Sequence, residues 1–216
     1  MHSGTFITFE GGEGSGKSTQ IALLEKAFQN AGIECVKTRE PGGSTGAEQI
    51  RDLLVNGDVD AWDADTETLL FYAARLDHVN KIIKPALKKK HTVLCDRFAD
   101  STMVYQGVGK QVPNDYIHAL HKLTLGDFSP NLTLMFDIDP KIGLKRAADR
   151  NGGEGRFESM DISFHQQVRQ GFLKIAKTDP ERCAVIDASL DIQTVHQSII
   201  TLVNQRLGTT LKSCQT

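Results

Sequence analysis

The chain has 216 residues, of which 39% are hydrophobic and 24% are charged, and these proportions are typical of a globular protein. Its 25 basic and 27 acidic residues leave a formal net charge of −2, which argues against a nucleic-acid-binding protein. No window approaches the roughly 18 consecutive apolar residues of a membrane span, and residues 1–10 lack the pattern of a signal peptide. We therefore expect a single cytoplasmic domain over residues 1–216, without a membrane partner and with a frayed tail after residue 207.

Short apolar runs alternate with longer amphipathic stretches along the chain. Runs rich in β-branched and aromatic residues predict strands, and apolar residues spaced three and four apart predict helices. The expected elements, in chain order, are a strand at 5–9, a helix at 18–31, a strand at 33–38, helices at 45–55 and 65–80, and strands at 92–95, 132–138 and 183–186. Strands separated by helices pair in parallel through right-handed crossovers. The fold class is therefore α/β, a five-stranded parallel sheet with helices on both faces.

Two of these helices carry a pattern that predicts which face is buried. The first has apolar residues on one side at Ile21, Leu24, Ala27 and Phe28. The helix at 65–80 has apolar residues in register at Leu69, Leu70, Ala73 and Leu76. The four cysteines form no C-x-x-C pair, and three of them lie in strand-like runs, so we expect buried free thiols.

The segment from Gly11 to Ser18 fits the phosphate-binding pattern G-x-x-x-x-G-K-[ST], after a predicted strand and before a predicted helix. Its glycines allow successive backbone N–H groups to surround phosphate oxygens at the positive end of a helix. Lys17 would place its charge on the β- and γ-phosphates, and the Ser18 hydroxyl can bind Mg²⁺. The pattern predicts a P-loop NTPase fold that binds ATP or GTP through Gly11, Gly12, Glu13, Gly14, Ser15, Gly16, Lys17, Ser18 and Thr19.

Other motifs narrow the class of P-loop protein. A guanine-reading N-K-x-D is missing, because Asn80-Lys81 continues as Ile-Ile. The strand at 92–95 is followed by Asp96-Arg97, where a hydrolytic ATPase would carry Asp-Glu to polarise a water. Asp96 can hold Mg²⁺, and Arg97 offers a planar guanidinium to a phosphate. This pair favours a kinase whose acceptor is itself a phosphate.

Several ordered motifs resemble those of the bacterial thymidylate kinases, which phosphorylate dTMP with ATP. They are F-E-G-x-E-G-S-G-K-S-T at 9–19, T-R-E-P-G-G at 38–43, F-Y-A-A-R at 71–75, D-R-F at 96–98, S-T-M-V-Y-Q-G at 101–107 and R-F-E at 156–158. The resemblance runs from about residue 6 to residue 207. It implies Mg²⁺ as cofactor, ATP and dTMP as substrates, and a cytosolic homodimer.

The resemblance also implies roles for individual residues. Phe71 would stack on thymine and Arg75 would bond a thymine carbonyl, although a core aromatic and a surface arginine are the alternatives from periodicity alone. Arg51 and Arg97 would grip the dTMP phosphate, and Glu13 would lie near the acceptor's sugar. The segment that lines the pyrimidine and sugar pocket would contribute Ser101, Thr102, Tyr105 and Gln106. Ser101 is also a good helix N-cap, and both readings can hold together.

The segment at 146–158 resembles a short mobile lid, rich in glycine and arginine. One subclass of the family carries a catalytic arginine in the P-loop, and another supplies it from the lid. Gly14 occupies that P-loop position here, so the resemblance assigns the charge to Arg150 or Arg156. The segment Asp187-Ala188-Ser189 resembles the loop near the ATP adenine.

Two rival functions remain open at this point. The first is a related kinase acting on dUMP, UMP or a deoxynucleoside, because one methyl group in a pocket is worth only about 1–3 kcal/mol of discrimination. The second is a non-catalytic nucleotide-binding switch or chaperone, in which the arginines of the acceptor site and lid would have no task.

Overall fold

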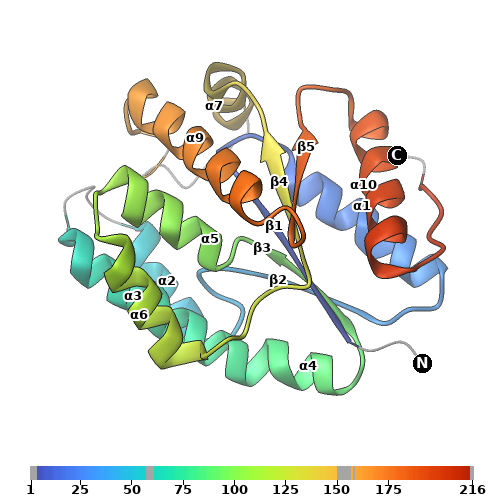
Figure 1. Cartoon of the computed structure of the whole chain (residues 1–216), viewed down its shortest axis with the longest axis horizontal. Helices are drawn as coiled ribbons and strands as arrows, with labels where there is room; N and C mark the ends of the chain where they lie inside the picture. The colour runs from blue at the N-terminus through green and yellow to red at the C-terminus, as the bar shows by residue number, and fades with distance from the viewer. Residues whose placement is uncertain (1–3, 57–60, 150–156, 158, 215–216) are drawn as a thin grey trace.

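The computed structural model describes residues 4–56, 61–149, 157 and 159–214. Within these residues, five parallel strands form one sheet in the order β2-β3-β1-β4-β5 (Figure 1). The strands are β1 (Thr5–Gly11), β2 (Cys35–Arg39), β3 (Thr92–Asp96), β4 (Leu132–Asp137) and β5 (Cys183–Asp187). The central strand β1 pairs with β3 in a register that starts at Thr5 and Thr92, and with β4 in one that starts at Ile7 and Leu132. The expected α/β fold with a five-stranded parallel sheet is confirmed.

Helices connect every pair of successive strands. They are α1 (Lys17–Asn30), α2 (Thr45–Val55), α3 (Ala64–His78), α4 (Lys84–Lys88), α5 (Ala99–Thr102), α6 (Asn114–Leu125), α7 (Pro140–Ala148), α9 (Ile162–Thr178) and α10 (Ile192–Leu207). Two π-helical segments, η1 (Val79–Ile83) and η2 (Met103–Gly109), continue α3 and α5. Side chains from Ser44, Asp63, Asp161 and Asp191 cap the first turns of α2, α3, α9 and α10.

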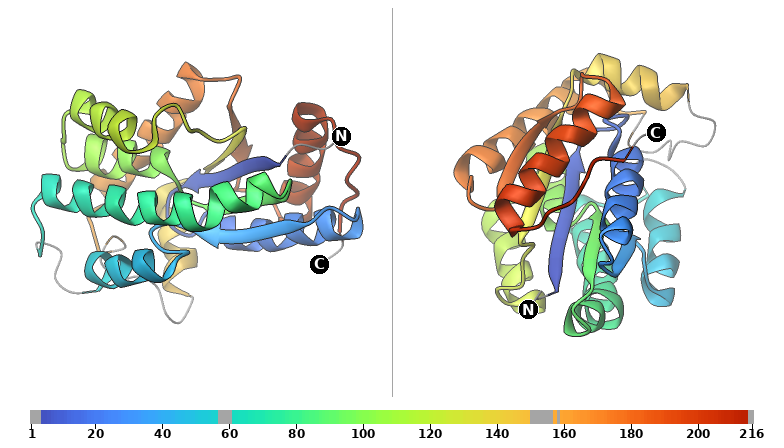
Figure 2. Two further views of the ribbon diagram at one scale, coloured as in Figure 1. Left: turned by 90° about the horizontal axis from the view of Figure 1, so that it is seen from below. Right: turned by 90° about the vertical axis from the view of Figure 1, so that its right-hand side faces the viewer.

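Helices cover both faces of the sheet (Figure 2). On one face α1 and α10 pack over β1 and β4, where Ile7, Phe28 and Ile199 belong to the same buried cluster. On the other face, η1 and α4 cover β1 and β3, while α9 and η2 cover β4. All seven residues of β1 are buried, as expected for a strand covered on both sides.

The buried face predicted for α1 is confirmed, whereas the one predicted for α3 is wrong. Ile21, Leu24, Ala27 and Phe28 are all buried. On α3, Leu69 is 48% exposed, and the buried residues are Glu67, Thr68, Tyr72, Ala74, Arg75 and His78. Polar side chains fill this face because they bond partners outside the helix: Glu67 binds Gln106 and Lys110, and Arg75 and His78 bind Glu40. Apolar periodicity therefore points to the wrong side of the helix.

The tail after α10 packs against the core instead of fraying. Gly208 ends the helix with a left-handed φ of 64°. Leu211 and Cys214 are buried in the same cluster as α1 and α10, and the Asn204 side chain accepts a hydrogen bond from the Leu211 amide at 2.7 Å. All four cysteines are free thiols, three buried and Cys35 partly buried.

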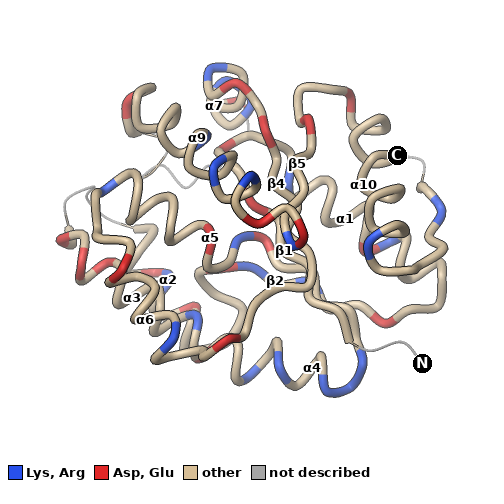
Figure 3. The backbone as a smooth tube through the Cα atoms, in the orientation of Figure 1, with Lys and Arg blue, Asp and Glu red and all other residues tan. Residues whose placement is uncertain are grey.

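Backbone positions of lysine and arginine and those of aspartate and glutamate are both distributed over many elements of the fold (Figure 3). Among the described residues, no helix is both long enough and apolar enough to cross a membrane.

Candidate active site

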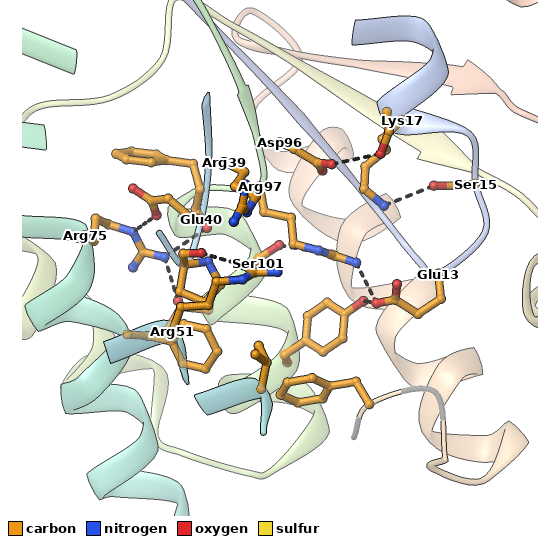
Figure 4. A pocket seen from close by; sticks show the side chains of 18 of the residues that line it. Glu13, Ser15, Lys17, Arg39, Glu40, Arg51, Arg75, Asp96, Arg97 and Ser101 are labelled. Carbon is orange, nitrogen blue, oxygen red and sulfur yellow. Dashed lines mark hydrogen bonds and ion pairs between the residues drawn. The ribbon is translucent and has the colours of Figure 1, made fainter. Parts of the chain in front are cut away.

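The predicted site residues meet at the carboxyl ends of β1 and β3, around a cavity of about 550 Å³ (Figure 4). This is the edge at which a parallel sheet collects its ligands. The predicted residues that line the cavity are Glu13, Gly14, Ser15, Gly16, Lys17, Ser18, Arg51, Phe71, Arg75, Asp96, Arg97, Ser101, Thr102, Tyr105 and Gln106. Gly11, Gly12 and Thr19 are not among the lining residues. Arg150 and Arg156 lie outside the described residues.

The loop between β1 and α1 has the geometry of an anion cradle. Gly14 and Gly16 have φ values of 66° and 87°, which residues other than glycine adopt at a cost. No side chain caps the N-terminus of α1, so its first amide groups remain available to a ligand. A Cβ on Gly14 would lie 1.8 Å from the Gly143 carbonyl oxygen of α7. The loop therefore requires glycine here for both its backbone angle and its space.

Lys17 holds a buried positive charge in this loop. Its ammonium group donates to the carbonyls of Gly11 and Gly12 at 3.1 and 3.0 Å and to Ser15 Oγ at 3.3 Å. Burial, together with the nearby Arg97, lowers the pKa of Lys17 to about 8. Phosphate oxygens would supply the negative charge that this ammonium group lacks.

Ser18 and Asp96 form a small oxygen site beside Lys17. The Ser18 hydroxyl donates to Asp96 Oδ2 at 3.3 Å, and Asp96 Oδ1 is buried without a hydrogen-bond partner among the described residues. An orphaned carboxylate oxygen next to a hydroxyl suits Mg²⁺, which takes one or two protein oxygens and completes its shell with water and phosphate. Among the described residues, no group of three or more histidine, cysteine, aspartate or glutamate side chains is placed to hold a metal ion.

Arg97 lies at the centre of the cavity on a left-handed backbone with φ of 66° (Figure 4). Its guanidinium donates to the Gly11 carbonyl at 3.0 Å, to Ser101 Oγ at 3.3 Å and to Glu13 Oε1 at 2.6 Å. Burial alone would lower the pKa of Arg97, but Glu13, Tyr105, Asp96 and Glu10 together outweigh that effect and raise it. The arginine is therefore a permanent cation, aimed across the mouth of the P-loop.

Glu13 is an acid among phosphate-binding amides, and its neighbours compensate for that position. The Tyr105 hydroxyl donates to Glu13 Oε1 at 3.0 Å, and Arg97 lies over the Tyr105 ring at 5.0 Å. Burial would raise the pKa of Glu13, yet Arg97 and Lys17 hold it below its ordinary value. The carboxylate is thus ionised and ties the P-loop to the far wall of the cavity.

Arg75 is buried at 2% exposure, so the alternative of a surface arginine is wrong. Its Nε donates to Glu40 Oε2 at 2.7 Å, and its Nη2 donates to the Phe98 carbonyl and Thr102 Oγ1. The remaining nitrogen, Nη1, is buried without a partner among the described residues. A buried donor without an acceptor costs free energy, and a polar ligand in the cavity could supply that acceptor.

Glu40 is the main residue that sequence reasoning missed. It accepts from Arg75 and also contacts His78 Nδ1 at 3.0 Å, while His78 Nε2 contacts Thr38 Oγ1 at 2.7 Å. The sequence feature that could have identified it is the T-R-E-P-G-G motif, which contains Glu40 but does not indicate its partners. The other lining residues without a predicted role are Arg39, Pro41, Val55 and Phe98, whereas Ala147 and Phe157 belong to the predicted lid at 146–158.

The remaining predicted residues complete the wall opposite the P-loop. Phe71 is half-buried and lines the cavity, unlike an aromatic packed wholly in the core. Arg51 donates to the Pro41 carbonyl at 2.5 Å, and burial, with Arg39 nearby, lowers its pKa. The amide nitrogen of Gln106 donates a hydrogen bond to the buried Glu67 at 2.9 Å. The amide oxygen of Gln106 therefore points away from Glu67.

Ser101 does not cap a helix, so that alternative is wrong. Helix α5 begins at Ala99, and the residue before it provides no side-chain cap. The Ser101 hydroxyl instead donates to Glu10 Oε2 at 2.6 Å. Residue type alone suggests an N-cap at Ser101, but tertiary contacts shape the turn that precedes α5 and the helix begins two residues earlier.

Within the predicted lid, Phe157 lines the cavity and packs against Tyr105 with ring centroids 5.4 Å apart. Arg146, in the last turn of α7, donates to the Ala188 carbonyl at 3.0 Å. Its charge is therefore directed to the loop after β5, in the segment expected near the adenine.

Comparison with known proteins gives a consistent result. The family model described as thymidylate kinase matches residues 9–199. A thymidylate kinase of Caulobacter vibrioides is 52% identical over 208 residues, covering 96% of this chain and 100% of that protein. One from Afipia carboxidovorans is 52% identical over 210 residues, covering 96% and 92%. The crystal structure of thymidylate kinase from Ehrlichia chaffeensis superimposes with a TM-score of 0.77 at 37% identity, covering 93% of this chain and 99% of that one.

Proposed function

The chain belongs to the thymidylate kinase family, and from this premise we propose how its residues divide the work of the reaction. It is an ATP-dependent dTMP kinase, which transfers the γ-phosphate of ATP to dTMP. The observation that carries the residue assignments is one cavity of about 550 Å³, with the P-loop at one end and Phe71 and Arg75 at the other. Two nucleotides placed end to end would bring their phosphates together beside Arg97.

The P-loop, residues 11–19, binds the phosphates of ATP. Backbone N–H groups at the start of α1 donate to the phosphate oxygens, and Lys17 lies against the β- and γ-phosphates. The lowered pKa of the lysine supports this role, because burial and the nearby Arg97 disfavour its charge and phosphate oxygens would stabilise it.

Ser18 and Asp96 are the residues that would hold Mg²⁺, and the unpartnered Asp96 Oδ1 supports their assignment. When bound, the ion neutralises charge on the transferring phosphate. The protein's own contribution is to keep both oxygens at the base of the P-loop.

The acceptor dTMP occupies the other end of the cavity. Arg97 and Arg51 grip its phosphate, Phe71 stacks on the base, and Arg75 donates its free Nη1 to a thymine carbonyl. Ser101, Thr102, Tyr105 and Gln106 line the sugar and base pocket. The acceptor phosphate is largely dianionic at pH 7, because its second pKa is about 6. It therefore needs no general base, and the enzyme's task is to orient two phosphates and offset their repulsion.

Glu13 lies at the junction of the two nucleotides, near the acceptor's sugar. Its ion pair with Arg97 has a length of 2.6 Å in the structure. The dTMP phosphate competes with Glu13 for that guanidinium, so acceptor binding loosens the link between the P-loop and the opposite wall.

Two further features follow from the family resemblance. The lid supplies a catalytic arginine, Arg150 or Arg156, and the kcat values of Arg150→Ala and Arg156→Ala would distinguish the two. The enzyme acts as a cytosolic homodimer, and light scattering on the purified protein measures that state directly.

The test of the proposed function is ADP release measured with Mg²⁺, ATP and a panel of nucleoside monophosphates. We expect turnover with dTMP, much weaker turnover with UMP and CMP, and none in Lys17→Ala. Equal rates with all pyrimidine monophosphates would contradict thymidylate specificity. Nucleotide binding without acceptor-stimulated turnover would favour the non-catalytic switch.

A further inference from the structure

Glu10 is a buried acid that none of the roles above uses. It lies near the carboxyl end of β1 with 0% exposure, directly before the first P-loop glycine. It does not line the cavity. A carboxyl group buried in a strand is costly unless it is hydrogen-bonded, so the contacts of this side chain indicate what it does.

Both carboxyl oxygens of Glu10 bind the segment that carries Arg97. The Phe98 amide donates to Oε1 at 2.7 Å, and the Ser101 hydroxyl donates to Oε2 at 2.6 Å. Phe98 is the residue before α5, and Ser101 lies within that helix. One side chain from β1 therefore binds both ends of the segment 98–101, which directly follows Arg97.

The turn requires such support because its backbone is irregular. Arg97 has a φ of 66°, a conformation that costs a residue with a Cβ about 1–2 kcal/mol. Phe98 has φ and ψ near −155° and −146°, and it provides no cap for the four residues of α5. Glu10, on the neighbouring strand β1, binds the backbone amide directly after Arg97 and so holds the strained residue in position.

A second connection runs through the Ser101 hydroxyl. A hydroxyl has one proton and two lone pairs. With the proton directed to Glu10, a lone pair of Ser101 is free to accept from Arg97 Nη1 at 3.3 Å. Glu10 is thus linked to Arg97 twice, through the backbone at Phe98 and through the side chain of Ser101.

The other carboxylate of this region, Asp100, is already occupied. Arg182 binds it through two nitrogens at 2.6 and 3.1 Å. Burial, with Asp100 second, raises the pKa of Glu10 to about 8. The geometry survives either protonation state, because a neutral carboxyl can donate its proton to Ser101 and still accept from Phe98.

We propose that Glu10 is a positioning residue that holds Arg97 where it binds the acceptor phosphate. The proposal rests on the role proposed above for Arg97. Glu10 acts from behind the cavity wall and touches neither nucleotide.

The test compares two conservative variants of Glu10 by steady-state kinetics. Glu10→Asp is one methylene shorter and cannot reach both Phe98 and Ser101, whereas Glu10→Gln keeps the length and a bonding atom for each. We expect Glu10→Asp to raise the KM for dTMP about tenfold, the effect of losing a hydrogen bond to a charged group, and to leave the KM for ATP nearly unchanged. Glu10→Gln should stay within about threefold of the wild type.

The matched control is Thr8→Val, two residues earlier in the same strand. Thr8 is equally buried, and its hydroxyl bonds Thr133 at 2.8 Å, away from Arg97. This variant should lower stability without a selective change in the KM for dTMP. If Thr8→Val and Glu10→Asp change the KM values alike, Glu10 has only a structural role and the proposal is wrong.

Combination with Arg97→Ala separates this inference from the proposed function. In that background Glu10→Asp should cause no further rise in the KM for dTMP, and a further rise would overturn the link through Arg97. If Arg97→Ala itself leaves the KM for dTMP unchanged, the role of Arg97 fails. If Arg97→Ala raises the KM and Glu10→Asp does not, only the positioning role of Glu10 fails.

Discussion

Buried acidic side chains lie directly behind several polar or cationic side chains of this cavity. Glu40 holds Arg75, Glu10 supports the turn of Arg97, and Glu67 binds both Gln106 and Lys110. Each acid is at most 5% exposed. Buried charges of this kind are tolerated only when paired and hydrogen-bonded. The arginines are therefore held in fixed positions before a nucleotide arrives, which lowers the conformational cost of binding.

At the residue scale, we predict that Glu40→Gln lowers the free energy of unfolding by about 3 kcal/mol, because it leaves a buried guanidinium without its counter-charge. Urea denaturation measures the change. The control is Glu25→Gln, which breaks the more exposed Lys37–Glu25 pair and should cost about 0–1 kcal/mol. Equal costs for the two variants would mean that Arg75 does not depend on Glu40.

At the scale of elements, the P-loop and α7 meet through two glycines. A Cβ on Gly14 would lie 1.8 Å from the Gly143 oxygen, and a Cβ on Gly143 would lie 2.4 Å from the Glu13 oxygen. Backbone thus packs on backbone where the donor-binding loop meets the helix that precedes the predicted lid. Neither element can shift toward the other.

We predict that Gly14→Ala is more destabilising than Gly208→Ala. The two glycines share left-handed φ values of 66° and 64°, but a Cβ on Gly208 meets nothing within 4 Å. Gly208→Ala should cost about 1 kcal/mol of backbone strain, and Gly14→Ala about 1–3 kcal/mol more for the displaced helix. Chemical denaturation without nucleotide compares them. Equal decreases in the free energy of unfolding for the two variants would show that α7 can move away from a side chain at position 14 at no cost.

The elements also show what the sequence can predict. Strands and α1 follow from apolar runs and periodicity, because the covered sheet and its helices bury apolar side chains. The buried face of α3 cannot be predicted in this way. Glu67, Arg75 and His78 are buried there because they bond partners that lie far away in the sequence. In the site, Lys17 and Arg97 could be predicted from motifs. Glu40 and Glu10 could not be given roles, because their contacts exist only after the strands and α3 come together.

At the scale of the whole molecule, the C-terminal segment closes the core. Leu211 and Cys214 pack with α1, whose first residue is Lys17, and Asn30 at the end of α1 donates to Cys214 Sγ at 3.5 Å. The Cys214 amide donates to His196 Nε2 at 3.2 Å. The tail is therefore tied to both helices that cover one face of the sheet.

This contact predicts a pH-dependent stability. Burial lowers the pKa of His196 below its ordinary value near 6.5, so above about pH 6.5 the side chain is neutral in both the folded and the unfolded state. As the pH falls below that value, the unfolded state binds the proton more readily and the folded state loses stability, until the pH passes the folded pKa. Thermal unfolding from pH 8 to 5 should show a smaller fall in Tm for His196→Gln than for the wild type.

The control for this experiment is His118→Gln, at an exposed position of α6. Its Tm profile should follow that of the wild type. If His196→Gln also follows the wild type, protonation of the buried imidazole does not limit stability in this range.

The contact between Gly14 and Gly143 also constrains how such an enzyme can evolve. A long side chain at position 14 has no room while α7 keeps its place, so an arginine cannot enter the P-loop by one substitution without disturbing that helix. Placing a long side chain at position 14 therefore demands coordinated changes in both elements. We therefore expect positions 14 and 143 to change together during evolution, so that a replacement at one is accompanied by a change at the other.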